Sequence, residues 1–86
     1  MDKNTSVFTV KKILDRSESI TTVVHDYEGE WQFLGNGEVT ISDLLIISLN
    51  QLLEIDNSIE SLLNMSKGVE ANRVKDGEWS FTKLEH

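Results

Sequence analysis

His25 and Asp26 are the neighbouring residues of this chain whose types could do acid–base chemistry. A carboxylate can orient an imidazole as a general base when a substrate proton lies within hydrogen-bond reach. Neighbouring residues on a strand point to opposite faces of a sheet, however, so such a pair rarely acts together. The alternative is structural: His25 closes a strand, and Asp26 accepts hydrogen bonds from the backbone of the following turn. We favour the structural interpretation and expect no catalytic residue, with an enzyme that uses His25 as a general base as an alternative.

A metal or cofactor site needs further groups that the sequence does not supply. The chain has no cysteine, and its other histidine belongs to Leu84-Glu85-His86, a stretch typical of a vector-derived histidine tag. A zinc site would need two or three more ligands at suitable spacing. Gly35-Asn36-Gly37 lacks the spacing and the lysine of a phosphate-binding loop. We therefore expect no metal and no cofactor.

Two kinds of residue could instead form a protein-binding surface. Tryptophan is enriched among the residues that dominate protein interfaces, and Trp79 lies in a C-terminal hairpin that is a candidate sheet edge. Acidic residues crowd the two ends of one predicted strand, where they form either a solvated rim or a negative surface for a basic partner. The candidate partner-binding residues are Asp26, Glu28, Glu30, Glu38 and Trp79.

The elements that must position these residues centre on a predicted β-hairpin over residues 20–34. Its first strand is a run of Ile, Thr and Val. Its second strand alternates polar residues with Trp31 and Phe33, which puts both rings on one face of the sheet. Asp26 and Gly29 suit the turn between the two strands.

The remaining N-terminal half leaves two alternatives open. Residues 6–10 predict a first strand, and residues 11–14 either continue it or close into a helical turn. Asn-Gly is a strong hairpin signal, so residues 35–38 either fold the chain back against residues 31–34 or form an open loop.

Segment 41–65 fits either one long helix or a strand followed by two helices. The dense apolar run over residues 44–47 is typical of a strand buried on both faces. Two capping boxes then follow, Ser48 with Gln51 and Asn57 with Glu60. We therefore favour a strand at 43–47, helices near 48–55 and 57–64, and Gly68 as the end of the helical region.

A second hairpin is predicted from residues 69–74 and 78–82, around Lys75-Asp76-Gly77. Its sequence Gly77-Glu78-Trp79-Ser80-Phe81 echoes Gly29-Glu30-Trp31-Gln32-Phe33. The echo is either a duplication or the same solution to one turn-and-packing problem, and we favour the second, because repeats need similarity over whole units.

Composition narrows the classes of partner. The 86 residues suffice for one domain, and 15 acidic against 8 basic residues give a net charge of −7, or −6 without Glu85. Such acidity argues against nucleic acid and against an anionic membrane surface, both of which attract Lys and Arg clusters. The longest apolar run, residues 44–47, is too short to span a bilayer, and no signal-peptide segment opens the chain. We expect a cytoplasmic protein.

The central hairpin resembles that of a group of small, uncharacterised bacterial proteins. They share a pattern of His-Asp, two residues, Gly, one residue and Trp-Gln-Phe, matched here by His25, Asp26, Gly29, Trp31, Gln32 and Phe33. More remotely, the chain is similar to a domain family of unknown function that includes immunity proteins of bacterial toxin systems. The resemblance implies an α+β fold and agrees with the division of segment 41–65, but it supplies no activity.

These patterns predict a single α+β domain over residues 1–83, with residues 1–5 frayed. We expect a mostly antiparallel sheet of five or six strands with one or two short helices packed on one face. The predicted core contains Val7, Ile20, Val24, Trp31, Phe33, Leu45, Ile47, Leu52, Ile59 and Leu63.

The expected function is that of a non-enzymatic, protein-binding module whose partner is another protein, a basic one if the protein is immunity-like. No nucleic acid or membrane partner is expected. The alternatives are a housekeeping domain whose acidity maintains solubility, and a homodimer formed through an uncovered strand edge.

Overall fold

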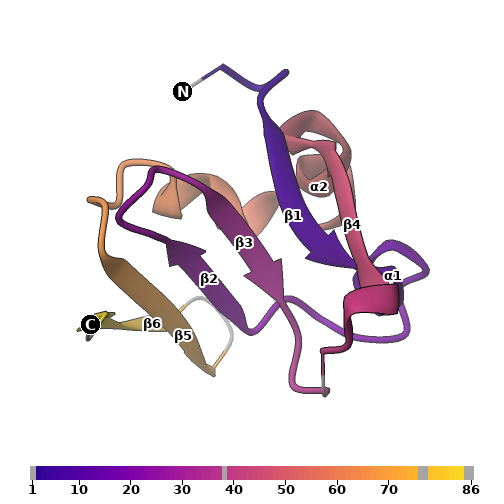
Figure 1. Cartoon of the computed structure of the whole chain (residues 1–86). Helices are drawn as coiled ribbons and strands as arrows, with labels where there is room; N and C mark the ends of the chain where they lie inside the picture. Colours follow the sequence, from indigo (N-terminus) through magenta and orange to yellow (C-terminus); the bar gives the residue numbers. More distant parts are fainter. Residues whose placement is uncertain (1, 38, 76–77, 85–86) are drawn as a thin grey trace.

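The computed structural model describes residues 2–37, 39–75 and 78–84 of the chain. Within them six strands form one sheet in the order β4-β1-β3-β2-β5-β6 (Figure 1). Neighbouring strands are antiparallel except β1 and β3, which run parallel. With η denoting a 3-10 helix, the elements are β1 (Ser6–Val10), α1 (Lys11–Leu14), β2 (Thr22–His25), β3 (Trp31–Leu34), η1 (Ile41–Asp43), β4 (Leu44–Ser48), α2 (Leu49–Ile55), η2 (Asn57–Leu62), β5 (Val69–Lys75) and β6 (Glu78–Lys83). The predicted α+β fold with a mostly antiparallel sheet is confirmed.

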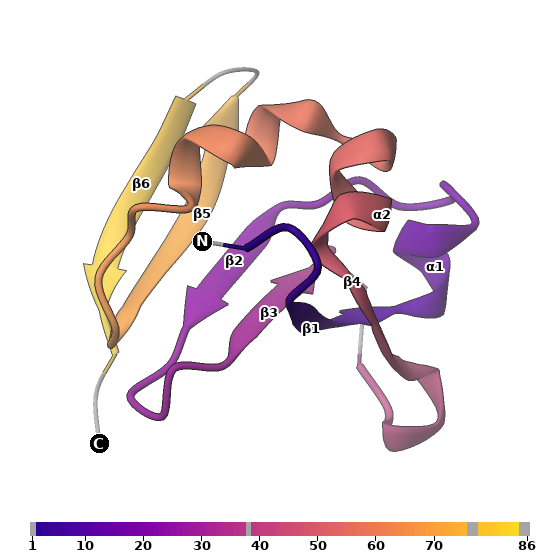
Figure 2. The same cartoon turned by 90° about the horizontal axis from the view of Figure 1, so that it is seen from above.

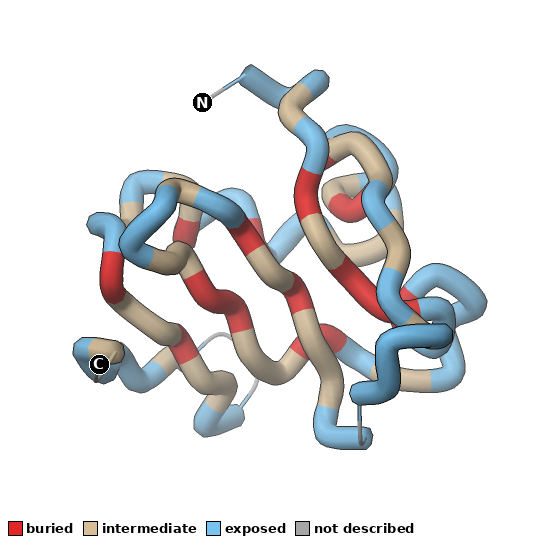
Figure 3. The backbone as a smooth tube through the Cα atoms, viewed as in Figure 1, coloured by how far each residue is buried: buried red, intermediate tan, exposed pale blue. Residues whose placement is uncertain are grey.

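The two faces of the sheet differ in how they are covered. Both α2 and η2 lie on the same side of the sheet (Figure 2). Buried and half-buried positions alternate along β3, as strand geometry requires, whereas Val23 and Val24 of β2 are both buried (Figure 3). The core joins the sheet to α1, α2 and η2, and its buried members are Val7, Val10, Ile13, Ile20, Val23, Trp31, Phe33, Leu49, Leu52, Ile59, Leu62 and Ala71.

The central hairpin has the predicted form. In β2 and β3, Val23 lies opposite Phe33 and His25 lies opposite Trp31, so these four side chains share the face that is turned toward the helices. Both Trp31 and Phe33 are buried, and their rings lie 6.1 Å apart between centroids.

The division of segment 41–65 is also confirmed. Strand β4 is followed directly by α2, because Ser48 accepts a hydrogen bond from the Gln51 N–H while the Gln51 side chain accepts one from the Ser48 N–H. The second predicted capping box is wrong. The side chain of Asp56 accepts from the Ser58 N–H, so η2 is capped one residue earlier than the Asn57 box requires.

Strand β4 contradicts the prediction of a strand buried on both faces. It is an edge strand, and Leu44 and Ile46 on its open face are 41% and 64% exposed. Of the predicted core, Leu45, Ile47 and Leu63 are only half-buried. The other predicted core residues are buried, namely Val7, Ile20, Val24, Trp31, Phe33, Leu52 and Ile59.

Two further outcomes concern glycines. Of the two alternatives for residues 35–37, the structure has the open loop, because β3 already lies between β1 and β2 and the Gly37 N–H donates to the Glu18 carboxylate at 2.7 Å. Gly68 does not end a helix directly, since η2 ends at Leu62. The second hairpin forms as predicted, with Asp76 and Gly77 of its turn outside the described residues.

The core role of Trp31 can be tested by truncation. Trp31→Ala should lower the free energy of unfolding by about 3–5 kcal/mol, because it leaves a cavity beside Phe33 under α2 and η2. Ile41→Ala is the control, since Ile41 is 90% exposed, and it should change stability by about 0.5 kcal/mol at most. Urea unfolding followed by circular dichroism measures both. A loss for Trp31→Ala as small as that of the control would contradict the described core.

Candidate functional site

The imidazole of His25 is part of the packing of the hairpin. Its ring stacks on Trp31 with centroids 4.0 Å apart, and Nδ1 lies 2.8 Å from the Met65 carbonyl oxygen, to which a protonated Nδ1 donates. The backbone carbonyl of His25 accepts from the Gly68 N–H at 2.6 Å. The ring and the backbone of His25 thus both tie β2 to the segment that follows η2.

Asp26 organises the turn between β2 and β3. Its Oδ1 accepts hydrogen bonds from the N–H groups of Glu28 and Glu30, each at 2.9 Å. Gly29 has φ +91°, a conformation that side chains other than glycine resist. Because Asp26 points its carboxylate at backbone donors and His25 points its ring at Trp31, the two residues do not face one another as a catalytic pair would.

The turn also closes over the C-terminal end of β6. The Tyr27 hydroxyl donates to the Leu84 carbonyl oxygen at 2.9 Å, and the Leu84 N–H donates to the Gly68 carbonyl at 2.9 Å. Gly68 has φ +79°, and a Cβ there would lie 2.6 Å from the Tyr27 ring. Most of the His-Asp-x-x-Gly-x-Trp-Gln-Phe motif therefore has a folding role; Gln32 alone points to the other face of the sheet.

The structure does not bring all the candidate partner-binding residues together. Glu28 and Glu30 are exposed at the turn between β2 and β3. Trp79 lies opposite Arg73, near the far end of the sheet, and Glu38 lies outside the described residues. Asp26 is engaged within the turn. Only Glu28 and Glu30 remain as a local pair of exposed carboxylates.

Trp79 is half-buried and serves an internal contact. The guanidinium of Arg73 lies 4.4 Å from the centroid of its ring, a cation–π arrangement. The same guanidinium donates to the Ile20 carbonyl and to the Asp56 carboxylate, each at 2.9 Å. Arg73 thereby connects β5, β6, η2 and the start of the central hairpin.

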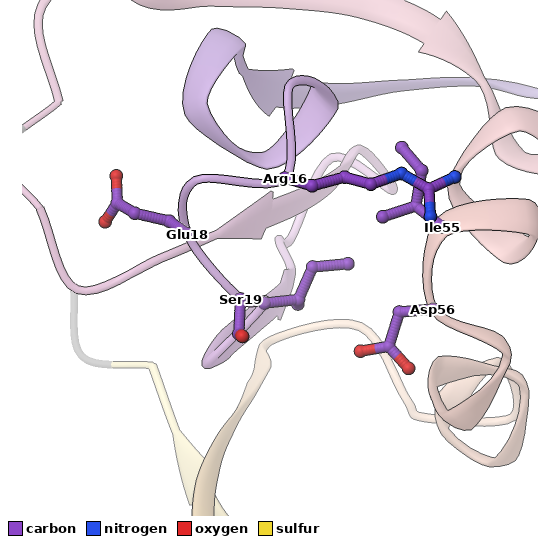
Figure 4. A pocket seen from close by; sticks show the side chains of 6 residues that line it. Arg16, Glu18, Ser19, Ile55 and Asp56 are labelled. Carbon is purple, nitrogen blue, oxygen red and sulfur yellow. The ribbon is translucent and has the colours of Figure 1, made fainter.

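A cavity of about 260 Å³ opens beside this network, and its lining residues are Arg16, Glu18, Ser19, Ile20, Ile55 and Asp56 (Figure 4). Small-molecule sites usually enclose about 300–1,000 Å³. Both carboxylates of the lining are already engaged, Asp56 by Arg73 and Ser58 and Glu18 by Gly37. The cavity is therefore a weak candidate for a ligand site.

The open face of the sheet is the larger unexplained surface. Strand register sets its side chains in two rows that cross all six strands. In the order of the strands, one row is Leu44, Val10, Leu34, Thr22, Asn72 and Ser80. The neighbouring row is Ile46, Phe8, Gln32, Val24, Glu70 and Thr82. Val10, the N-cap residue of α1, is buried with the core. We name the exposed and half-buried apolar residues on β4, β1 and the end of β3 the apolar strip; it comprises Phe8, Leu34, Leu44 and Ile46.

The other half of the open face is polar and internally bonded. The Thr22 hydroxyl donates to Asn72 Oδ1 at 3.0 Å, and Asn72 Nδ2 donates to Glu70 Oε2 at 2.8 Å. The apolar strip was missed at the sequence level, because the four consecutive apolar residues of β4 predict a strand covered on both sides. The strand alternation itself identifies Leu44 and Ile46 once β4 is placed at the edge.

Residues 2–37, 39–75 and 78–84 contain no group of three or more His, Cys, Asp or Glu side chains that could hold a metal ion. Among the same residues no helix has the length and apolarity that crossing a membrane requires.

The packing of Tyr27 over Gly68 predicts a difference between two glycine substitutions. Both Gly29→Ala and Gly68→Ala place a side chain at positive φ, which should cost about 1–2 kcal/mol. At Gly29 the nearest atom is the Cε of Lys67 at 3.3 Å, which can move, whereas at Gly68 the Tyr27 ring must be displaced. Urea unfolding should therefore show the larger loss for Gly68→Ala, and adding Tyr27→Ala should remove the excess. Equal losses would contradict the described closure.

No protein-family model, curated protein or solved structure matches the chain. The geometry of its own surfaces therefore provides the basis for inferring what the chain does.

Proposed function

We propose that this protein is a non-enzymatic, cytoplasmic binding module that presents the open face of its sheet to a protein partner with apolar and cationic side chains. The observation that carries the proposal is the apolar strip. Within the described residues α2 and η2 cover the opposite face, while Ile46 and Leu44 of the strip are 64% and 41% exposed and Phe8 and Leu34 are half-buried. Contiguous exposed apolar surface on a soluble domain is typical of an interaction site.

The charge around the strip favours a cationic partner. At the strand positions of β4, β1, β3 and β2 that belong to the two rows, the open face has no charged side chain. On β5 and β6 the two rows contain one charged residue, Glu70, and the opposed pair Lys75 and Glu78 lies beyond them. The whole chain carries −7. Opposite charge on a partner would raise the rate of encounter, and the apolar strip would then supply the buried contact.

The carboxylates of Glu28 and Glu30 add negative charge near the apolar strip. Glu30 is two residues from Gln32, the strand partner of Phe8. Both carboxylates belong to a turn whose shape is held by Asp26, so they are presented by a rigid loop. The resemblance to immunity proteins of toxin systems points to the same class of partner, and a basic toxin would fit it.

The proposal predicts which substitutions abolish capture of a partner. Tagged protein would be used to recover partners from the native cell lysate at low and moderate salt. Leu44→Ser with Ile46→Ser should abolish recovery of the specific partner, because it removes the most exposed part of the apolar strip. Glu28→Lys with Glu30→Lys should slow association and remove most of its salt dependence.

Val74→Ser is the matched control, because Val74 is also an exposed aliphatic residue, at 65%, and lies on β5 away from the strip. It should leave recovery unchanged. If the wild-type protein recovers no partner, or if the control and the strip variants lose it equally, the binding-module proposal should be abandoned.

A further inference from the structure

The outer edge of β6 carries backbone groups that no described strand pairs. The Arg73 N–H donates to the Thr21 carbonyl, which turns the backbone of Arg73, and by alternation that of Ala71 and Val69, toward β2. The backbone of Glu70 and Asn72 therefore faces β6, where their partners are Thr82 and Ser80. The N–H and C=O groups of the intervening β6 residues therefore face outward, and these residues are Trp79, Phe81 and Lys83.

The opposite edge of the sheet is blocked in comparison. By the same alternation, the Leu49 N–H bond to Thr5 turns the backbone of Leu44, Ile46 and Ser48 outward. The Leu44 N–H is taken by the Ile41 carbonyl, and the Ser48 N–H by Gln51 Oε1 at 3.2 Å. Ile46 alone keeps an outward N–H on that edge. Capping of this kind is how natural sheets prevent edge pairing, and β6 lacks it among its described residues.

The hairpin that carries the open edge is also the electrically neutral part of an acidic chain. Residues 69–83 contain three basic residues and three acidic ones, namely Arg73, Lys75, Lys83, Glu70, Asp76 and Glu78. The rest of the chain therefore carries the whole net charge of −7. Two copies of this protein repel one another at most orientations, but least where their β6 edges meet.

We propose that a second copy of this chain pairs with the edge, its β6 running antiparallel to the first with Phe81 opposite Phe81. In this register Trp79 lies opposite Lys83 of the second copy, and all three facing pairs exchange both backbone hydrogen bonds. The side chain of Phe81, 58% exposed in the single chain, packs against its counterpart on the two-fold axis.

The same register avoids facing like charges. Lys83 lies opposite Trp79, an uncharged residue, and Ser80 lies opposite Thr82 on the other face of the sheet. A parallel arrangement in register would instead place each Glu78 beside Glu78 and each Lys83 beside Lys83. A single strand pair buries less surface than a standard interface, so the dimer is expected to dissociate on dilution.

The pairing has a consequence for the open face. A two-fold axis normal to the sheet joins the two sheets edge to edge and keeps both open faces on the same side. Two apolar strips would then face a partner together, which raises the apparent affinity for a repeated or dimeric partner. This consequence depends on the proposed function, whereas the dimer does not.

The dimer can be tested on the purified protein with no partner present. Sedimentation equilibrium of the wild-type chain should show a mass that rises with concentration from 9.8 kDa toward twice that value. Phe81→Lys should hold the mass at that of one chain, because it places two like charges on the two-fold axis. Ile46→Lys, the same change on the blocked edge, should leave the rise intact. Loss of the rise in both variants or in neither would overturn the proposal.

Amide exchange of the wild-type chain provides a second measurement that needs no variant. The outward N–H groups of Trp79, Phe81 and Lys83 should exchange more slowly as protein concentration rises, while the Ile46 N–H should not change. A mass of one chain at every concentration, or exchange of the three amides that is independent of concentration, would refute the dimer even if partner capture through the apolar strip succeeds.

Discussion

The structure depends on one constraint: the chain has too few helical residues to cover both faces of its sheet. Six strands present two faces, and α2 and η2 together cover one of them. The core is therefore one-sided: Trp31, Phe33 and Val23 point at the helices, and the alternate side chains of the same strands point away from them. A small chain buries a limited share of its surface, so an uncovered sheet face follows directly from this division of residues. The candidate function follows from the same division, because the open face contains the apolar strip.

The stacking of His25 on Trp31 shows that residue types able to do catalysis have a structural role in this chain. A histidine beside an aspartate suggests a catalytic base, yet the ring contacts Trp31 and the Met65 carbonyl while the carboxylate holds the turn. Gly29 and Gly68 then permit the close approach of the turn to the C-terminal hairpin. The motif that stands out in the sequence is thus explained by folding, and the surface with binding potential lies elsewhere.

Local signals in the sequence were sufficient for most of the fold. Ser48 and Gln51 predict the start of α2, and the alternation around Trp31 predicts the face of β3. What could not be predicted is the order of strands, because β1 pairs with β3 and β4 through contacts distant along the chain. For that reason Leu44 and Ile46 were expected in a strand buried on both faces, and Trp79 was grouped with the acidic turn although it lies at the other end of the sheet. The Gly-Glu-Trp-x-Phe echo shows the same limit: Phe33 is fully buried in a central strand, whereas Phe81 is exposed on an edge.

The central claim is that the open face, and not the helical face, is the surface that meets a partner. Methyl-labelled and amide-labelled protein, titrated with the partner recovered from the native lysate, tests this claim most directly by nuclear magnetic resonance. The account predicts that the largest shift changes fall on the apolar strip, with smaller ones at Glu28 and Glu30. Changes concentrated on exposed residues of α2 and η2, with the strip unaffected, would contradict it.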